Sequence, residues 1–267
     1  MRRIESLPSG RALKFMPPES DFFLVIPAYD ERRRLPLFLK DLVEALADAP
    51  FLSTVQIVED GSSAETRSQL ARALSSISGK GSVSLRPVLG QTPGRGKGRA
   101  IRMGWAGPST APWLGFVDAD GAVPAAEVRR VLTRVYETGG ENQAACFMAT
   151  RTNRSGRVVR RRRLRNMAGR LFTFGINALF QTHFSDTQCG FKIVSRSAWN
   201  KISSGCVENG FSFDVELLVR LRQVQAIIRE VGIDWEEKPG GHFHPAVDGW
   251  GTLWRAIRLR ILLLVGR

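Results

Sequence analysis

Short apolar segments alternate with helical patterns through the first half of the chain. Apolar runs typical of buried strands occupy residues 22–26, 55–58, 83–89, 113–117 and 146–150. Between them, helical spacing of apolar residues covers 35–46 and 65–77, a third helix runs to Met103, and a fourth begins at Pro124. Alternating strands and helices predict a mostly parallel sheet that helices cover on both faces. The expected fold class is therefore α/β.

The second half of the chain follows a different pattern. Residues 151–170 are rich in arginine, and an apolar, aromatic segment follows at 171–180. We expect a helix over 213–221, a closing strand over 227–235 and an amphipathic helix over 250–265. The apolar stripe of this last helix consists of Trp250, Leu253, Trp254, Ile257, Ile261 and Leu264. This stripe packs either on the protein's own core or against a membrane interface, which tryptophan favours.

These patterns predict three parts along the chain. Residues 1–20 contain several prolines and no periodicity, and we expect them to form a flexible leader. Residues 21–240 form the α/β domain, and residues 241–267 form a C-terminal amphipathic helical segment. Met1 is followed by two arginines but by no apolar core, and no apolar run approaches the ~20 residues that span a bilayer. We therefore expect neither a signal peptide nor a transmembrane helix.

The strongly basic composition indicates an anionic partner. The chain has 39 Lys and Arg against 25 Asp and Glu, a net charge of +14. The arginine-rich stretch lacks interleaved aromatic residues and is followed by apolar ones, which favours an anionic membrane surface over nucleic acid. Cys146, Cys189 and Cys206 are odd in number and lack metal spacing, as is typical of reduced thiols. We expect a cytoplasmic protein that associates peripherally with the cytoplasmic face of a membrane.

Polar or glycine-rich residues follow four of the predicted strands. They lie at 29–31, 59–62, 94–98 and 118–121, and the carboxyl ends of parallel strands form one edge where α/β proteins bind ligands. Asp118 and Asp120 there offer the hard oxygen ligands that Mg²⁺ or Mn²⁺ prefers, and such an ion would hold a diphosphate. Lys97 would pair with the same diphosphate. The alternatives are strand-end acids that cap the following helix and a plain glycine-rich turn.

Six short segments, taken in order, resemble a known family. They are Pro27-Ala28-Tyr29-Asp30-Glu31, Glu59-Asp60-Gly61-Ser62, Gly96-Lys97-Gly98, Asp118-Ala119-Asp120-Gly121-Ala122, Asp186-Thr187-Gln188-Cys189-Gly190-Phe191-Lys192 and Phe213-Asp214-Val215-Glu216-Leu217-Leu218. Together they resemble family 2 glycosyltransferases of GT-A fold, in the branch of dolichyl-phosphate β-glucosyltransferases and polyprenyl-phosphate glycosyltransferases. Asp30 stands where this family usually has Asn, and Glu59 where it usually has Asp.

The resemblance implies inverting transfer of a hexose, with UDP-glucose as the expected donor, to a polyprenyl or dolichyl phosphate at the membrane surface. The implied substrate-binding residues are Pro27, Tyr29 and Glu31 for the base and ribose, Asp60 for the base, Asp118 for the nucleotide, Gln188, and Arg151 with Arg162 for the lipid phosphate. The register of the last residue within 160–163 is open. The implied metal ligands are Asp118 and Asp120, and the implied catalytic residues are Lys97 and Asp214.

The acceptor determines what Asp214 would do. A hydroxyl acceptor must lose a proton, so Asp214 would then be the general base. A lipid phosphate is already anionic at neutral pH and needs positioning by arginines instead, so Asp214 would orient basic groups. The other functions that the sequence leaves open are transfer to a hydroxyl acceptor, a nucleotidyltransferase and a basic nucleic-acid-binding α/β module.

Overall fold

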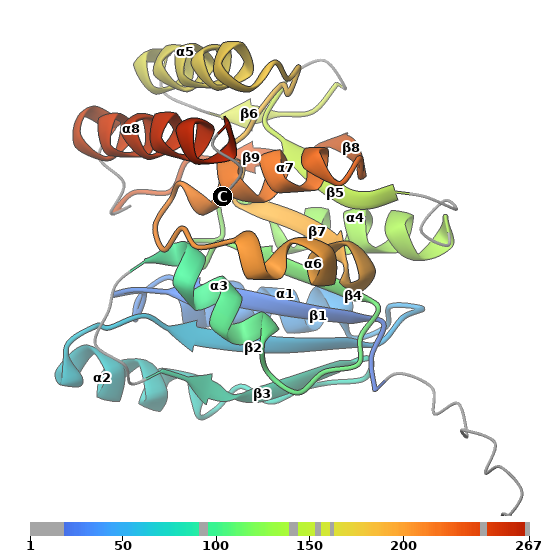
Figure 1. Ribbon diagram of the computed structural model, residues 1–267. Helices are drawn as coiled ribbons and strands as arrows, with labels where there is room; N and C mark the ends of the chain where they lie inside the picture. The colour runs from blue at the N-terminus through green and yellow to red at the C-terminus, as the bar shows by residue number, and fades with distance from the viewer. Residues whose placement is uncertain are drawn as a thin grey trace, which may run out of the picture.

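The computed structural model describes residues 19–90, 96–138, 144–152, 156–160, 163–240 and 245–264. A seven-stranded sheet has the order β3-β2-β1-β4-β7-β5-β8, and a two-stranded sheet pairs β6 with β9 (Figure 1). The large sheet consists of β1 (Phe22–Ala28), β2 (Ser53–Glu59), β3 (Val83–Leu89), β4 (Trp113–Val117), β5 (Ala144–Thr150), β7 (Phe191–Ser195) and β8 (Ile227–Gly232). The small sheet consists of β6 (Val159–Arg160) and β9 (Trp235–Glu236).

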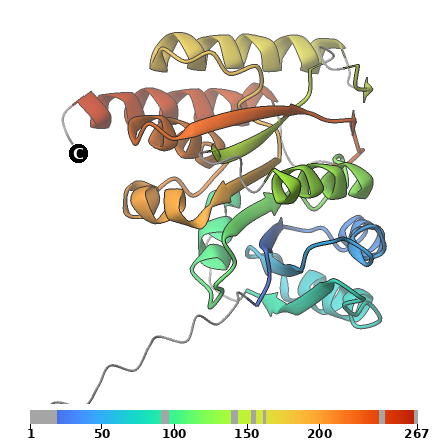
Figure 2. The same ribbon diagram turned by 90° about the vertical axis from the view of Figure 1, so that its right-hand side faces the viewer.

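Helices cover both faces of the large sheet, which confirms the predicted α/β architecture (Figure 2). On one face, α1 (Leu35–Leu46), α2 (Ala64–Leu74) and α4 (Ala125–Glu137) bury their apolar stripes against one core cluster. On the other, α3 (Lys97–Trp105), α6 (Arg196–Ile202) and α7 (Phe213–Gln223) pack against a second cluster. The alternation of side chains along β1 divides them accordingly, with Phe22 and Leu24 in the first cluster and Phe23 and Val25 in the second.

Strand β7 runs antiparallel to its neighbours β4 and β5, whereas β1, β2, β3 and β4 pair in parallel with one another and β8 pairs in parallel with β5. The register pairs Val117, the last residue of β4, with Phe191, the first residue of β7. The turn before β7, residues 186–190, therefore lies at the edge where the parallel strands end. This reversal brings a segment from the second half of the chain beside Asp118.

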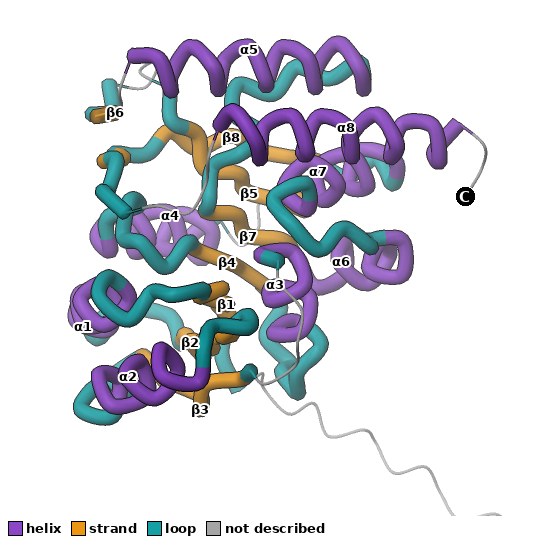
Figure 3. The backbone as a smooth tube through the Cα atoms, turned by 90° about the vertical axis from the view of Figure 1, so that its left-hand side faces the viewer, coloured by secondary structure: helices purple, strands orange, loops and turns teal. Residues whose placement is uncertain are grey.

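A further helical layer lies outside α7. It consists of α5 (Arg163–Phe180) and α8 (Pro245–Leu264), which lie side by side at one end of the molecule (Figures 1 and 3). Ile176 and Phe180 of α5 pack with Ala256 and Leu259 of α8 and with Val219 of α7. In the described part of the chain, no helix combines the length and the apolarity needed to cross a membrane.

The predicted element boundaries differ from the structure in a few places. Strand β1 continues through Pro27, which is tolerated because β1 pairs with β4 only as far as Val25. Pro124 is the N-cap of α4 rather than its first residue. The strand predicted over 227–235 is divided between β8 and β9, and α8 begins five residues before the predicted 250.

The first two described residues contact the domain, although the leader was predicted to extend to residue 20. Glu19 donates its backbone N–H to the Thr110 hydroxyl at 3.3 Å, and Ser20 is buried. Residues 1–18 lie outside the described residues.

Candidate active site

The polar segments after the parallel strands meet at the carboxyl edge of the sheet. Asp30 donates its backbone N–H to the Ser62 hydroxyl at 2.9 Å, which joins the segments after β1 and β2. The backbone N–H of Gly96 donates to the Asp60 carboxylate, which joins the start of α3 to the same edge. Asp30 has a φ of 51°, a left-handed conformation that Asp and Asn tolerate better than other side chains. Aspartate and asparagine therefore both suit position 30.

Two lysines and two aspartates form an alternating chain of charges at this edge. The Lys97 ammonium lies 2.9 Å from Asp118 Oδ1 and 2.9 Å from Asp214 Oδ2. The Lys192 ammonium lies 2.5 Å from Asp214 Oδ1. Both ammonium groups lie over the Phe116 ring, at 5.0 and 5.5 Å from its centroid. The structure therefore brings together both predicted catalytic residues and one predicted metal ligand.

The charges in this chain stabilise one another. Burial by itself would raise the pKa of Asp214, but the Lys192 and Lys97 charges and hydrogen bonds lower it below its usual value. Burial would lower the pKa of Lys97, but Asp118 and Asp214 raise it above its usual value. Asp214 is completely buried and stays ionised. A carboxylate held in this way is a weak general base.

The turn before β7 touches Asp118 directly. The backbone N–H of Asp118 donates to the Gly190 carbonyl oxygen at 2.9 Å. A Cβ at Gly190 would lie 1.8 Å from Asp118 Oδ2, so any side chain there would displace the carboxylate. The glycine of the Asp-Thr-Gln-Cys-Gly-Phe-Lys segment is therefore required for the close approach of the two strand ends.

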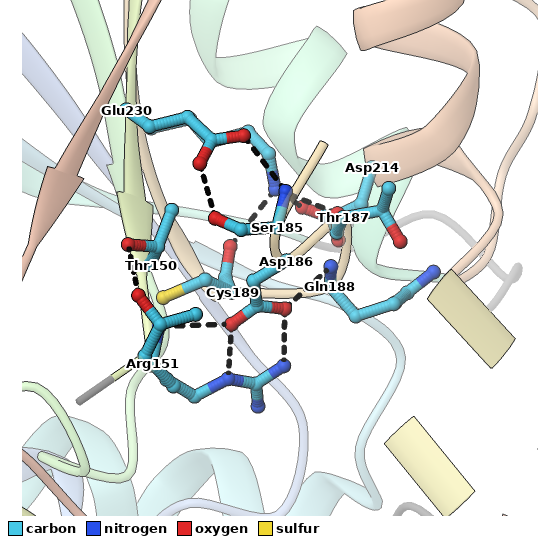
Figure 4. A network of polar contacts seen from close by, with 11 residues as sticks. Thr150, Arg151, Ser185, Asp186, Thr187, Gln188, Cys189, Asp214 and Glu230 are labelled. Carbon is cyan, nitrogen blue, oxygen red and sulfur yellow. Dashed lines mark hydrogen bonds and ion pairs between the residues drawn. The ribbon is translucent and has the colours of Figure 1, made fainter. Parts of the chain in front are cut away.

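Arg151, which follows β5, is held by Asp186 from the same turn. Figure 4 shows the guanidinium and the carboxylate facing each other, with Nε–Oδ2 at 2.7 Å and Nη2–Oδ1 at 2.8 Å. The Arg151 backbone N–H also donates to Oδ2, at 3.1 Å, and the guanidinium lies 5.4 Å from the centroid of the Trp235 ring. Arg151 thus reaches the predicted edge, but its charge is already balanced by a buried carboxylate.

Other arginines of the 151–170 stretch form ion pairs or lie exposed on α5, and some fall outside the described residues. Arg157 lies 3.5 Å from Glu127, and the exposed Arg160 lies 3.7 Å from Glu236. Arg162, predicted to contact the lipid phosphate, lies outside the described residues. Arg170 is exposed on α5.

The residues expected to hold the nucleotide lie on or just after the first two strands and in the 186–190 turn. Pro27 and Tyr29 are half-buried at the end of β1, and Asp60 is buried after β2. The Glu31 carboxylate accepts from the Arg34 guanidinium, with one contact at 2.8 Å. Gln188 extends its side-chain amide to the Phe211 carbonyl oxygen at 3.4 Å, so it bridges two loops of the edge.

The two predicted metal ligands keep accessible carboxylates. The Asp118 side chain is 39% exposed and the Asp120 side chain is half-buried, with its Oδ1 accepting from the Ala122 backbone N–H at 3.0 Å. The described residues contain no group of three or more His, Cys, Asp or Glu side chains that could hold a metal by themselves. Mg²⁺ is usually bound by one or two carboxylates together with substrate phosphates, so the two aspartates fit such an ion.

Sequence reasoning assigned no role to two buried charged residues. Lys192 is fully buried on β7, and Glu216 of α7 accepts from the backbone N–H groups of Val207 and Glu208, the latter at 2.8 Å. The signal for Lys192 was its position: β7 alternates between the two sheet faces, and both faces are covered. A lysine at such a position requires a buried anionic partner.

Comparisons with known proteins agree with this architecture. A family model described as Glycosyl transferase family 2 matches residues 23–203. A dolichyl-phosphate β-glucosyltransferase of Dictyostelium discoideum is 29% identical over 250 residues, covering 91% of this chain and 75% of the relative. The mouse dolichyl-phosphate β-glucosyltransferase is 30% identical over 236 residues, covering 85% of this chain and 71% of the relative.

Solved structures share the fold. Glucosyl-3-phosphoglycerate synthase from Mycobacterium tuberculosis, in complex with UDP, superimposes with a TM-score of 0.61 at 16% identity, covering 93% of this chain and 81% of that one. The same enzyme with Mn²⁺, UDP and glucosyl-3-phosphoglycerate gives a TM-score of 0.58 at 15% identity, covering 91% and 79%. The predicted GT-A fold is confirmed, and the chain belongs to the family 2 glycosyltransferases.

Proposed function

We propose that this glycosyltransferase moves glucose from UDP-glucose to a dolichyl or polyprenyl phosphate, with inversion, at the cytoplasmic surface of a membrane. The names of the similar proteins support the sugar and the acceptor. The observation that carries the proposal is the state of Asp214. Its carboxylate is fully buried between two ammonium groups, so it is poorly suited to deprotonate a hydroxyl. An acceptor that is already anionic needs no such base.

The edge of the sheet supplies groups for each part of the donor. Tyr29, Glu31 and Asp60 would contact the nucleoside, and Lys97 would stabilise the charge on the departing diphosphate. Mg²⁺ or Mn²⁺, held by Asp118 and Asp120, would neutralise the same diphosphate. Arg151 would hold the acceptor phosphate beside the sugar, with Gln188 at the neighbouring loop. For this, the guanidinium has to share its donors between the phosphate and Asp186.

The outer helices provide a surface that fits a membrane. Helix α5 exposes Met167, Leu171 and Phe174, at 65, 71 and 71%, on the side opposite its buried Thr173 and Ile176. Helix α8 exposes Trp254 and Ile261, at 69 and 55%, whereas its buried face consists of Thr252, Ala256 and Leu259.

Both outer helices thus carry a second apolar stripe that faces away from the protein. Arg170, Arg255 and Arg258 are exposed on the same helices. Apolar stripes bordered by arginine suit the headgroup region of an anionic bilayer.

Transfer is tested by supplying radiolabelled UDP-glucose with dolichyl phosphate, in the presence of Mn²⁺, Mg²⁺ or a chelator. We expect a metal-dependent lipid-linked glucose whose anomeric coupling constant shows the β configuration. GDP-glucose and other UDP-sugars serve as donor controls. Glucose transfer to a water-soluble sugar or a glycolipid hydroxyl, with none to dolichyl phosphate, would contradict the proposed acceptor.

Membrane association is tested with vesicles of neutral lipid and of neutral plus anionic lipid. We expect recruitment to the anionic vesicles that weakens as salt rises. Replacing Leu171, Phe174 and Trp254 together by Ser should abolish recruitment. The matched control is Leu37→Ser, because Leu37 is equally exposed, at 69%, but lies on α1. Equal binding of the triple variant and the control would assign the basic, apolar surface to another partner.

A further inference from the structure

Lys192 lies on β7, between β4 and β5, and its side chain carries a buried ammonium group. Its register partners are Phe116 on β4 and Met148 on β5, and its side chain is completely buried. The three hydrogens of the ammonium have three acceptors: the Thr187 carbonyl oxygen at 3.2 Å, the Cys189 carbonyl oxygen at 2.9 Å and Asp214 Oδ1 at 2.5 Å. Burying a charge at such a position is costly unless an opposite charge and well-placed hydrogen bonds compensate for the lost hydration.

These contacts connect Lys192 to Asp118 and to Lys97, the two residues of the sheet edge that would serve the donor diphosphate. Through the two carbonyl groups it fixes the turn that presses Gly190 against Asp118. Through Asp214 it reaches Lys97, because each oxygen of that carboxylate serves one lysine. Lys97 in turn lies 2.9 Å from Asp118 Oδ1. The Lys192 ammonium thus contacts both the turn that lies against Asp118 and the Asp214 carboxylate that pairs with Lys97. Asp118 and Lys97 are the residues that would face the donor.

We propose that Lys192 is a positioning residue of the transfer reaction, which acts through Asp214 to hold Lys97 at the diphosphate. This inference rests on the proposed function. Without Lys192, the buried Asp214 would keep a single counter-ion. The Lys97 ammonium would then be drawn inward to Asp214 and away from the edge, because a buried carboxylate with too little positive charge around it is strongly unfavourable. The donor would lose a charge-assisted contact.

A double-mutant cycle tests this relationship. UDP binding in Mn²⁺ is measured by calorimetry for the wild type, Lys192→Met, Asp214→Asn and the double variant, each with its thermal unfolding. We expect Lys192→Met alone to weaken UDP binding roughly tenfold to hundredfold. In the Asp214→Asn background the same substitution should cause no further loss. The double variant should also recover thermal stability, because both buried charges are gone.

A purely structural role gives a different result. Val131→Ala, in the core of α4 away from the edge, should lower the unfolding temperature yet keep the wild-type affinity for UDP. Wild-type affinity in folded Lys192→Met, or additive losses in the double variant, would overturn the proposal. If Lys192→Met fails to fold, Lys192→Gln takes its place, since its amide still donates hydrogen bonds but carries no charge.

The cycle also separates this inference from the proposed function. If the wild type binds UDP but transfers no glucose to dolichyl phosphate, the acceptor assignment fails while the cycle still decides the role of Lys192. If the wild type binds no UDP, both proposals are overturned.

Discussion

The guanidinium of Arg151 and the carboxylate of Asp186 form a two-point ion pair between the end of β5 and the turn before β7. The side chains are only 11 and 9% exposed. The pair therefore fastens together two segments that are 35 residues apart in the chain. The pair can contribute to the free energy of unfolding and, separately, to binding of the acceptor phosphate. Unfolding experiments measure the first contribution directly.

Arg151→Met should lower the free energy of unfolding by about 3–5 kcal/mol, because it leaves the Asp186 carboxylate buried without a cation. The double variant Arg151→Met/Asp186→Asn should recover most of this loss. Urea unfolding at neutral pH measures both. The control is Arg160→Ala, which breaks the exposed contact with Glu236 and should cost less than about 1 kcal/mol. A loss for Arg151→Met as small as the control would mean that water solvates Asp186.

The same pair makes stability depend on pH. Burial would raise the pKa of Asp186, but Arg151 lowers it from 3.8 to about 2. Because the folded-state pKa is depressed, the stabilisation is complete above about pH 4 and is lost as the pH falls through about 2. It amounts to roughly 2 kcal/mol. The difference in unfolding free energy between wild type and Asp186→Asn should shrink by this amount between pH 5 and pH 2. A constant difference would contradict the assigned pKa.

Gly190→Ala should impair transfer about a hundredfold or more, because the new Cβ displaces the Asp118 carboxylate. Steady-state kinetics with UDP-glucose and dolichyl phosphate measure this loss. The control is Gly175→Ala in α5, where a Cβ meets no atom within 4 Å. That substitution should stabilise the protein by about 0.5–1 kcal/mol and leave transfer unchanged. Full activity of Gly190→Ala would show that the position of Asp118 is not critical.

Asp120→Asn should abolish metal-dependent transfer while changing the free energy of unfolding by less than about 0.5 kcal/mol. The amide oxygen can still accept from the Ala122 N–H, so the turn is kept and only the charge is lost. Manganese titration of transfer, together with thermal unfolding, checks both expectations. Asp41→Asn, on the exposed side of α1, should behave like the wild type. Wild-type metal dependence in Asp120→Asn would remove Asp120 from the metal site.

The three cysteines should react with a thiol reagent only after unfolding. Cys146, Cys189 and Cys206 are buried, free of disulfides, and burial raises the pKa of each thiol to about 12. At pH 8 the native protein should therefore consume almost no Ellman's reagent, whereas the protein in guanidinium should consume three equivalents. Rapid labelling of the native protein would show that one thiol is accessible.

The alternation of apolar and polar residues located the strand ends, and with them the edge that holds Asp118, Asp60 and Lys97. This inference succeeded because parallel strands all end on the same side of a sheet, so local pattern and global position coincide. The residues of the Asp-Thr-Gln-Cys-Gly-Phe-Lys segment were also identified from sequence, through their resemblance to a family. Apart from substrate binding by Gln188, their physical tasks were not.

Three features depend on contacts between residues far apart in the chain, which only the tertiary structure decides. The antiparallel direction of β7 carries Gly190 to Asp118, and no local pattern distinguishes it from a parallel strand. The burial of Lys192 is possible because Asp214 arrives from α7 to neutralise it. Periodicity placed Trp254 on an apolar stripe of α8, but it could not say which face packs. The face that packs contains Thr252, Ala256 and Leu259. These side chains are smaller than tryptophan, so they let α8 lie close to α5 and α7.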